Sequence, residues 1–180
     1  METTSRFQSR LLSSARRSRQ SPLSLLNKME KLIRRRFGDE KIAFTGEPHD
    51  FILLCDWLFL AAAFAGVDLG FAVRNKYPGL CPYCMQKRCQ CETVKFNTHK
   101  RWDGPVPEEG TIYDLQQMLT GIYPRERHTL KYCVEKVLEE IEEARQELEK
   151  SSPLIQIREE LADVFARLSP LAQFLGMPLC

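Results

Sequence analysis

The sequence lacks a long uninterrupted apolar run. Its most apolar stretch, Phe51–Val67, has 17 residues and contains Asp56, whereas a membrane-spanning helix needs about 20 apolar residues. Residues 1–20 also lack the apolar core of a secretory signal. We therefore expect a soluble, cytoplasmic protein that does not contact a membrane, in which Phe51–Val67 forms a buried core helix.

A strong net charge is also lacking, because the formal value is only +2. The charge is nevertheless uneven: residues 1–36 carry ten Lys or Arg against two Glu, and residues 133–163 carry ten acids against four bases. The Ser- and Arg-rich segment 1–20 is typical of a disordered basic tail, with an organellar transit peptide as the alternative in a eukaryotic source. It has no pattern of interleaved aromatic residues, so we do not expect nucleic acid as a partner.

Helical periodicity dominates the rest of the chain, and the expected class is all-α. Ser21-Pro22 is typical of an N-cap followed by Pro at the first helical position, and Gly38 ends the predicted helix. The segment 92–110 contains several Pro and Gly residues and predicts a loop. The expected organisation is a basic tail (1–20), N-terminal helices (21–75), a Cys-rich loop insertion (76–110) and a second helical region (111–180).

Two acidic motifs fall in the second helical region. Glu140 and Glu143 form one i, i+3 pair, and Glu160 and Asp163 form another. Residues with this spacing share one face of an α-helix. The short link Ser151–Pro153 predicts that the two helices pack antiparallel, apolar stripe against apolar stripe. The four carboxylates can then converge.

Converging carboxylates repel one another and raise one another's pKa values unless a cation neutralises them. Oxygen ligands without thiolate or imidazole suit Mg²⁺ or Mn²⁺, which also bridge to phosphate oxygens. The pattern therefore predicts a magnesium or manganese site. A solvated helix face is the alternative for a Glu-rich segment, but the Asp inside the apolar second helix favours the metal site.

The two motifs resemble those of the MazG-type all-α nucleotide pyrophosphohydrolases. The resemblance rests on Leu138-Glu139-Glu140-x-x-Glu143 followed by Glu160-Leu161-Ala162-Asp163-Val164 and covers Thr111–Pro178. Where many members of that family carry an Asn in the trailing helix, Gln173 is the nearest candidate. The resemblance implies an antiparallel helical bundle that assembles as a homodimer or homotetramer.

The same resemblance implies an activity and a set of roles. The reaction would convert a nucleoside triphosphate, NTP or dNTP, into the monophosphate and pyrophosphate, for example to remove non-standard nucleotides. Glu140, Glu143, Glu160 and Asp163 would bind Mg²⁺. Glu139 and Glu140 would be catalytic, with Glu139 binding a further metal or accepting a proton from the attacking water.

Four of the seven cysteines lie within eleven residues, as C-x-x-C (Cys81, Cys84) followed by C-x-C (Cys89, Cys91). These spacings can supply four thiolates to a tetrahedral, structural Zn²⁺, and His99 is a candidate replacement ligand. Reduced free cysteines and a redox pair are the alternatives. A disulfide framework is not expected, because the number of cysteines is odd and no secretory signal is present.

Three residues are candidates for substrate contacts. Arg127 and Lys131 flank the start of the acidic helix, where they could meet phosphates, and Trp102 could stack on a base. Each also has an ordinary alternative, as an exposed cation or a loop anchor. Two non-catalytic functions remain open: a zinc-stapled helical protein that binds nucleic acid through its basic tail, and a regulatory helical subunit that binds no nucleotide.

Overall fold

The structure is a computed structural model that describes residues 2–15, 20–37, 48–91, 102–174 and 176, without the side chains of Pro48 and Arg127. This part of the chain is helical and contains no strand, which confirms the expected all-α class. The helices are α1 (Thr4–Ala15), α2 (Pro22–Phe37), α3 (Pro48–Phe64), α4 (Leu69–Lys76), α5 (Ile112–Ile122), η1 (Arg125–Arg127), α6 (Leu130–Glu149) and α7 (Leu154–Phe174).

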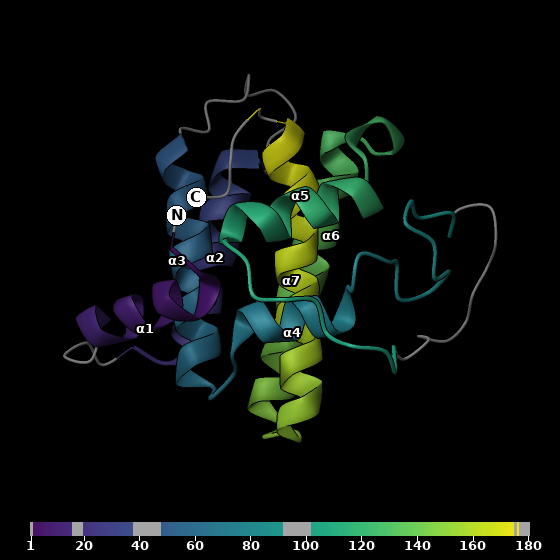
Figure 1. Cartoon of the computed structure of the whole chain (residues 1–180). Helices are drawn as coiled ribbons and strands as arrows, with labels where there is room; N and C mark the ends of the chain where they lie inside the picture. The colour runs from purple at the N-terminus through teal and green to yellow at the C-terminus, as the bar shows by residue number, and fades with distance from the viewer. Residues whose placement is uncertain (1, 16–19, 38–47, 92–101, 175, 177–180) are drawn as a thin grey trace.

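Helix α7 forms the centre of the fold. It runs through the middle of the molecule and is crossed by the short helices α4 and α5, while α6 lies along it (Figure 1). Helix α3 packs on α7 as well, and the rings of Phe59 and Phe165 meet edge to face at 6.0 Å. Both rings are fully buried. Four helices thus surround α7, and its side chains can meet residues from distant parts of the sequence.

Local sequence signals set the helix boundaries. Ser21 caps α2 by accepting a hydrogen bond from the Ser24 amide at 3.2 Å, as the Ser-Pro pair predicts. Thr111 and Asp114 form a reciprocal capping box at the start of α5. Helices α6 and α7 form a hairpin whose turn places Ser151 at a φ of 53°. The predicted two-helix arrangement of the acidic segment is therefore present.

The predicted core helix is present as α3, but it ends at Phe64, three residues before the expected Val67. The chain then bends by 96° into α4. Gly66 allows this bend because its φ of 77° lies in the left-handed region. Asp68 then caps α4 by accepting a hydrogen bond from the Phe71 amide at 2.8 Å. The bend aims the end of α4 at α7.

The prediction of a disordered tail over residues 1–20 needs correction, because residues 4–15 form helix α1. The buried side chain of Gln8 donates to the Val67 carbonyl at 2.6 Å and accepts from the Leu69 amide at 3.1 Å. The ring of Phe7 packs edge to face on Phe59 at 5.1 Å. These contacts tie α1 to the α3–α4 bend. The Ser- and Arg-rich composition misled the prediction, because the packed face contains polar residues such as Thr4 and Gln8.

None of the described helices is by itself long and apolar enough to cross a membrane. The segments His49–Phe64 and Leu69–Lys76 reach the necessary length and composition only when taken together as a bent pair.

Candidate metal sites

Three carboxylates come together where α6 packs against α7. One oxygen each from Glu140 of α6 and from Glu160 and Asp163 of α7 lie within 4.8 Å of one another. Glu140 and Asp163 are 7% and 8% exposed, and Glu160 is half-buried. The i, i+3 spacing puts Glu160 and Asp163 on one face of α7. We call Glu140, Glu160 and Asp163 the acidic triad.

The acidic triad suits a small divalent cation. Ligand oxygens lie about 2.1 Å from Mg²⁺, so adjacent oxygens of an octahedral site are about 3.0 Å apart and opposite oxygens about 4.2 Å apart. The three carboxylate oxygens lie within 4.8 Å of one another, which is close to these separations. Two of the three side chains are buried, and a cation held by the triad would have further coordination positions for water or phosphate.

The other two predicted acidic residues lie outside this group. Glu139 is exposed and pairs with Lys136 one turn earlier on α6. Glu143 is exposed too, but its charge contributes to raising the pKa values of Glu140 and Glu160, which places it close to the triad. The roles predicted for Glu139 and Glu143 stay predictions.

Two cations already compensate the acidic triad. Lys76, the last residue of α4, approaches Asp163 Oδ2 with its Nζ at 2.7 Å, and Arg167 Nε lies 3.0 Å from Glu140 Oε1. Tyr77 also donates its hydroxyl to Asp163 Oδ1 at 2.5 Å. The sequence analysis missed all three residues. A signal existed for Arg167, because it lies four residues after Asp163 and so on the same face of α7.

Burial dominates the electrostatics of the triad. It raises the pKa of Glu160 to about 7, with Asp163 adding to the rise and Lys76 opposing it. Burial also raises the pKa of Glu140, while the ion pair with Arg167 opposes this. Glu160 therefore takes up a proton near neutral pH when no external cation is present. A bound divalent cation would displace that proton.

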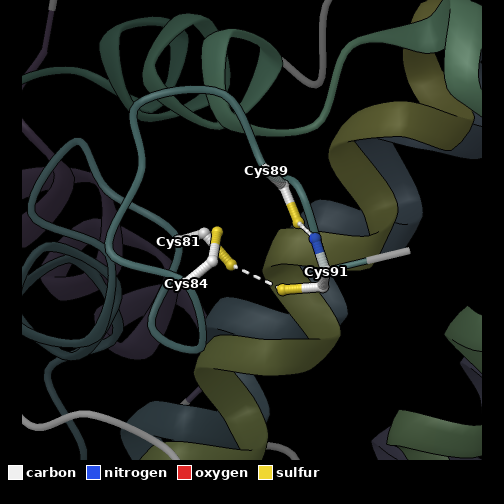
Figure 2. A group of neighbouring side chains, drawn as sticks. All are labelled: Cys81, Cys84, Cys89 and Cys91. Atoms are coloured by element: carbon white, nitrogen blue, oxygen red, sulfur yellow. Dashed lines mark hydrogen bonds between the residues drawn. The ribbon is translucent and has the colours of Figure 1, made fainter. Parts of the chain in front are cut away.

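The second group consists of the four clustered cysteines, whose Sγ atoms lie within 4.8 Å of one another. Figure 2 shows their side chains gathered on one loop, with the contact between Cys81 and Cys91 drawn as a dashed line; their Sγ atoms are 3.6 Å apart. A tetrahedral zinc site with Zn–S bonds of about 2.3 Å has sulfur–sulfur edges of about 3.8 Å. We call Cys81, Cys84, Cys89 and Cys91 the Cys cluster, and its dimensions fit such a site.

Hydrogen bonds directed at sulfur surround the Cys cluster. The Gln90 amide donates to Cys84 Sγ at 3.5 Å, and the Cys91 amide donates to Cys89 Sγ at 3.5 Å. The Tyr123 hydroxyl donates to Cys81 Sγ at 3.7 Å. A hydrogen bond from Cys89 lowers the pKa of Cys81 to about 4. The loop can therefore stabilise a thiolate, which is the form that binds a metal.

The predicted substrate-contacting residues are not shown beside the triad. Lys131 is exposed on α6, and the side chain of Arg127 lies outside the described part, as does His99, the candidate replacement ligand for zinc. Trp102 donates its indole N–H to the Pro105 carbonyl at 3.1 Å, as a loop anchor would. Gln173 is half-buried near the end of α7. Their roles toward substrate stay predictions.

Comparisons with protein-family models, with curated proteins and with solved structures give no match. The resemblance to MazG-type enzymes thus rests on the motif residues of α6 and α7 alone.

Proposed function

We propose that the protein is a Mg²⁺-dependent nucleoside triphosphate pyrophosphohydrolase. The observation that carries the proposal is the acidic triad: three carboxylates from two packed helices, with oxygens within 4.8 Å of one another. A group of buried carboxylates is costly without cations, and Mg²⁺ pairs naturally with a triphosphate substrate. The order of residues in the motif is that of the enzymes it resembles.

The residues of this chain take the following roles in the proposed reaction. Glu140, Glu160 and Asp163 would hold the Mg²⁺, which would neutralise phosphate charge and lower the pKa of bound water. Lys76 would be displaced from Asp163 by the cation and would then contact a phosphate oxygen, whereas Arg167 would keep Glu140 oriented. Glu143, exposed next to the triad, would be a fourth metal ligand, and Glu139 would bind a further metal or accept a proton from the attacking water.

A structural zinc ion belongs to the same proposal. The Cys cluster would hold Zn²⁺ as a closed site of four thiolates, with no position left for water or substrate. Such an ion orders a loop that contains no regular secondary structure between Pro78 and Cys91. It does not take part in the chemistry of the phosphates.

Pyrophosphate release tests the activity. The full-length protein is incubated with canonical and modified NTPs and dNTPs, in Mg²⁺ and then in EDTA, and pyrophosphate and monophosphate are quantified. We expect both products in equal amounts, only with Mg²⁺, and a loss of at least about a hundredfold in Glu160→Gln. Glu149→Gln, which neutralises an exposed acid of α6, should keep wild-type turnover. Equal activity of the two variants would contradict the assignment of the acidic triad as the active site.

A non-catalytic helical protein is the second candidate, and one observation favours it. Lys76 and Arg167 pair with two of the three triad carboxylates at 2.7 and 3.0 Å, so the group is largely neutralised without a metal. In that case the ion pairs would hold α4, α6 and α7 together as a structural element. The assay above distinguishes the two functions, because this candidate releases no pyrophosphate from any nucleotide.

A further inference from the structure

The Cys cluster and the acidic triad are joined by two short routes, and the first runs along the chain. Lys76 and Tyr77, which both contact Asp163, are followed by only three residues before Cys81. Tyr77 is 3% exposed, and Cys81 is fully buried. The position of the Cys cluster therefore constrains the end of α4, where Lys76 and Tyr77 lie.

The second route passes through side chains. Tyr123, at the end of α5, donates its hydroxyl to Cys81 Sγ at 3.7 Å. The guanidinium of Arg167 lies over the Tyr123 ring, 5.5 Å from its centroid, and the same guanidinium pairs with Glu140 at 3.0 Å. The Cys89 amide also donates to the Ile122 carbonyl at 2.8 Å, next to Tyr123. Cys89 is thus hydrogen-bonded to the residue that precedes Tyr123, and the Tyr123 ring contacts Arg167.

The two routes meet between the sites. The rings of Tyr77 and Tyr123 pack edge to face at 6.2 Å. Both tyrosines are nearly fully buried, and each uses its hydroxyl on a different site, Tyr77 on Asp163 and Tyr123 on Cys81. A displacement of the Cys81 loop would therefore move both tyrosines and with them the groups that orient the triad.

We propose that a Zn²⁺ ion held by the Cys cluster positions Tyr77 and Tyr123, and through them the acidic triad, so that zinc occupancy sets the affinity of the triad for a divalent cation. The inference concerns the proposed enzyme and rests on its metal-binding triad. Without zinc, no ion bridges the four Sγ atoms, and the loop loosens. The charges of Lys76 and Arg167 then remain nearby, but Asp163 and Glu140 lose their orientation, so cation binding weakens.

Mn²⁺ binding, measured by electron paramagnetic resonance, tests this inference on the full-length protein. Wild-type protein is prepared zinc-loaded and zinc-free, under reducing conditions, and its zinc content is determined by mass spectrometry. We expect one zinc per chain and a Mn²⁺ affinity that falls about tenfold or more on zinc removal, as is typical when the groups that orient metal ligands are lost. Adding Zn²⁺ back should restore it.

Three cysteine variants serve as tests and control. Cys84→Ala should lose zinc and Mn²⁺ affinity together; if it fails to fold, Cys91→Ala gives the same test, because Cys91 is only half-buried. In neither variant should added zinc restore wild-type binding. Cys55→Ala, which removes a buried thiol of α3 outside the cluster, should bind zinc and Mn²⁺ normally. Unchanged Mn²⁺ affinity in zinc-free protein, or purified protein that binds no zinc under these conditions, would overturn the inference.

A second readout separates this inference from the proposed function. The Arg167 Nε–H group donates to Glu140 at 3.0 Å, and its NMR cross-peak, assigned with Arg167→Lys, reports the positioning directly. We expect the peak to broaden or disappear when zinc is removed. If wild-type protein binds no Mn²⁺ but this peak responds to zinc, the enzyme proposal fails and the positioning stands. If Mn²⁺ binds but neither readout responds, only the positioning is refuted.

Discussion

Replacing Lys76 with Met removes the ammonium group that pairs with Asp163 and keeps most of the aliphatic side chain. The two side chains are 8% and 11% exposed, so this is a buried ion pair. Removal of one partner of such a pair costs about 3–5 kcal/mol, because the remaining charge is left uncompensated. The Tyr77 hydroxyl still donates to Asp163. We therefore expect Lys76→Met to lower the free energy of unfolding by about 3 kcal/mol in EDTA.

The same substitution should strengthen divalent-cation binding. When all groups are ionised, three triad carboxylates face two cations, Lys76 and Arg167, and the net charge is −1. Without Lys76 the net charge is −2, which a divalent ion balances, and the zinc-supported geometry remains. A cation at a hundred times its dissociation constant stabilises a protein by about 2.7 kcal/mol. Mn²⁺ should thus recover most of the stability that Lys76→Met loses.

Urea unfolding in EDTA and in Mn²⁺ measures both effects. Lys31→Met, which removes the same charge from an exposed position on α2, is the matched control and should behave as wild type. If Lys76→Met were as stable as the control in EDTA, the buried ion pair would not contribute to stability. If Mn²⁺ stabilised the variant no more than the wild type, Lys76 would not compete with a metal at the triad.

Three further predictions concern pH, a loop glycine and the N-terminal helix. In EDTA, the raised pKa of Glu160 makes the folded state bind more protons than the unfolded state, so the unfolding free energy should fall as pH rises from about 4.5 to about 7. Glu160→Gln should reduce this slope, and the part that Glu140 contributes should remain; an unchanged slope in urea unfolding would contradict the assignment. Gly79→Ala should destabilise the protein by about 1 kcal/mol, because the φ of Gly79 is +79°. Gly121→Ala, inside α5, should stabilise it by up to about 1 kcal/mol in the same thermal unfolding assay. Two changes of equal sign would contradict this argument from backbone conformation. Gln8→Ala should lower the free energy of unfolding by about 2 kcal/mol, because the Leu69 amide and the Val67 carbonyl lose their hydrogen-bond partner. Chemical unfolding measures this beside Gln117→Ala, a control at an exposed position. Equal stability of the two variants would mean that α1 does not pack against the α3–α4 bend.

Much of the fold could be predicted from local signals. Ser21-Pro22 marks the start of α2, and the spacing of acidic residues puts Glu160 and Asp163 on one face of α7. Each of these features depends on residues within one or two turns of each other. Sequence periodicity records such relations directly.

The remaining features depend on contacts between distant segments. Lys76 meets Asp163 across 87 positions of the chain, and no periodic pattern links the end of α4 with α7. The connection from Cys81 through Tyr123 to Arg167 likewise joins three different segments. The packing of Gln8 could not be predicted for another reason. Gln8 is a polar residue on the packed face of α1, where two hydrogen bonds satisfy its buried amide. Only an apolar residue at this position would have indicated packing.

Anomalous diffraction from crystals soaked in Mn²⁺ tests most directly whether the acidic triad is a metal site. Data are collected where manganese scatters anomalously and on both sides of the zinc absorption edge. We expect a manganese peak within coordination distance of Glu140, Glu160 and Asp163, with Lys76 displaced from Asp163, and a separate zinc peak among the four cysteines. A Lys76 that stays on Asp163, with no manganese at the triad, would contradict the proposed enzyme.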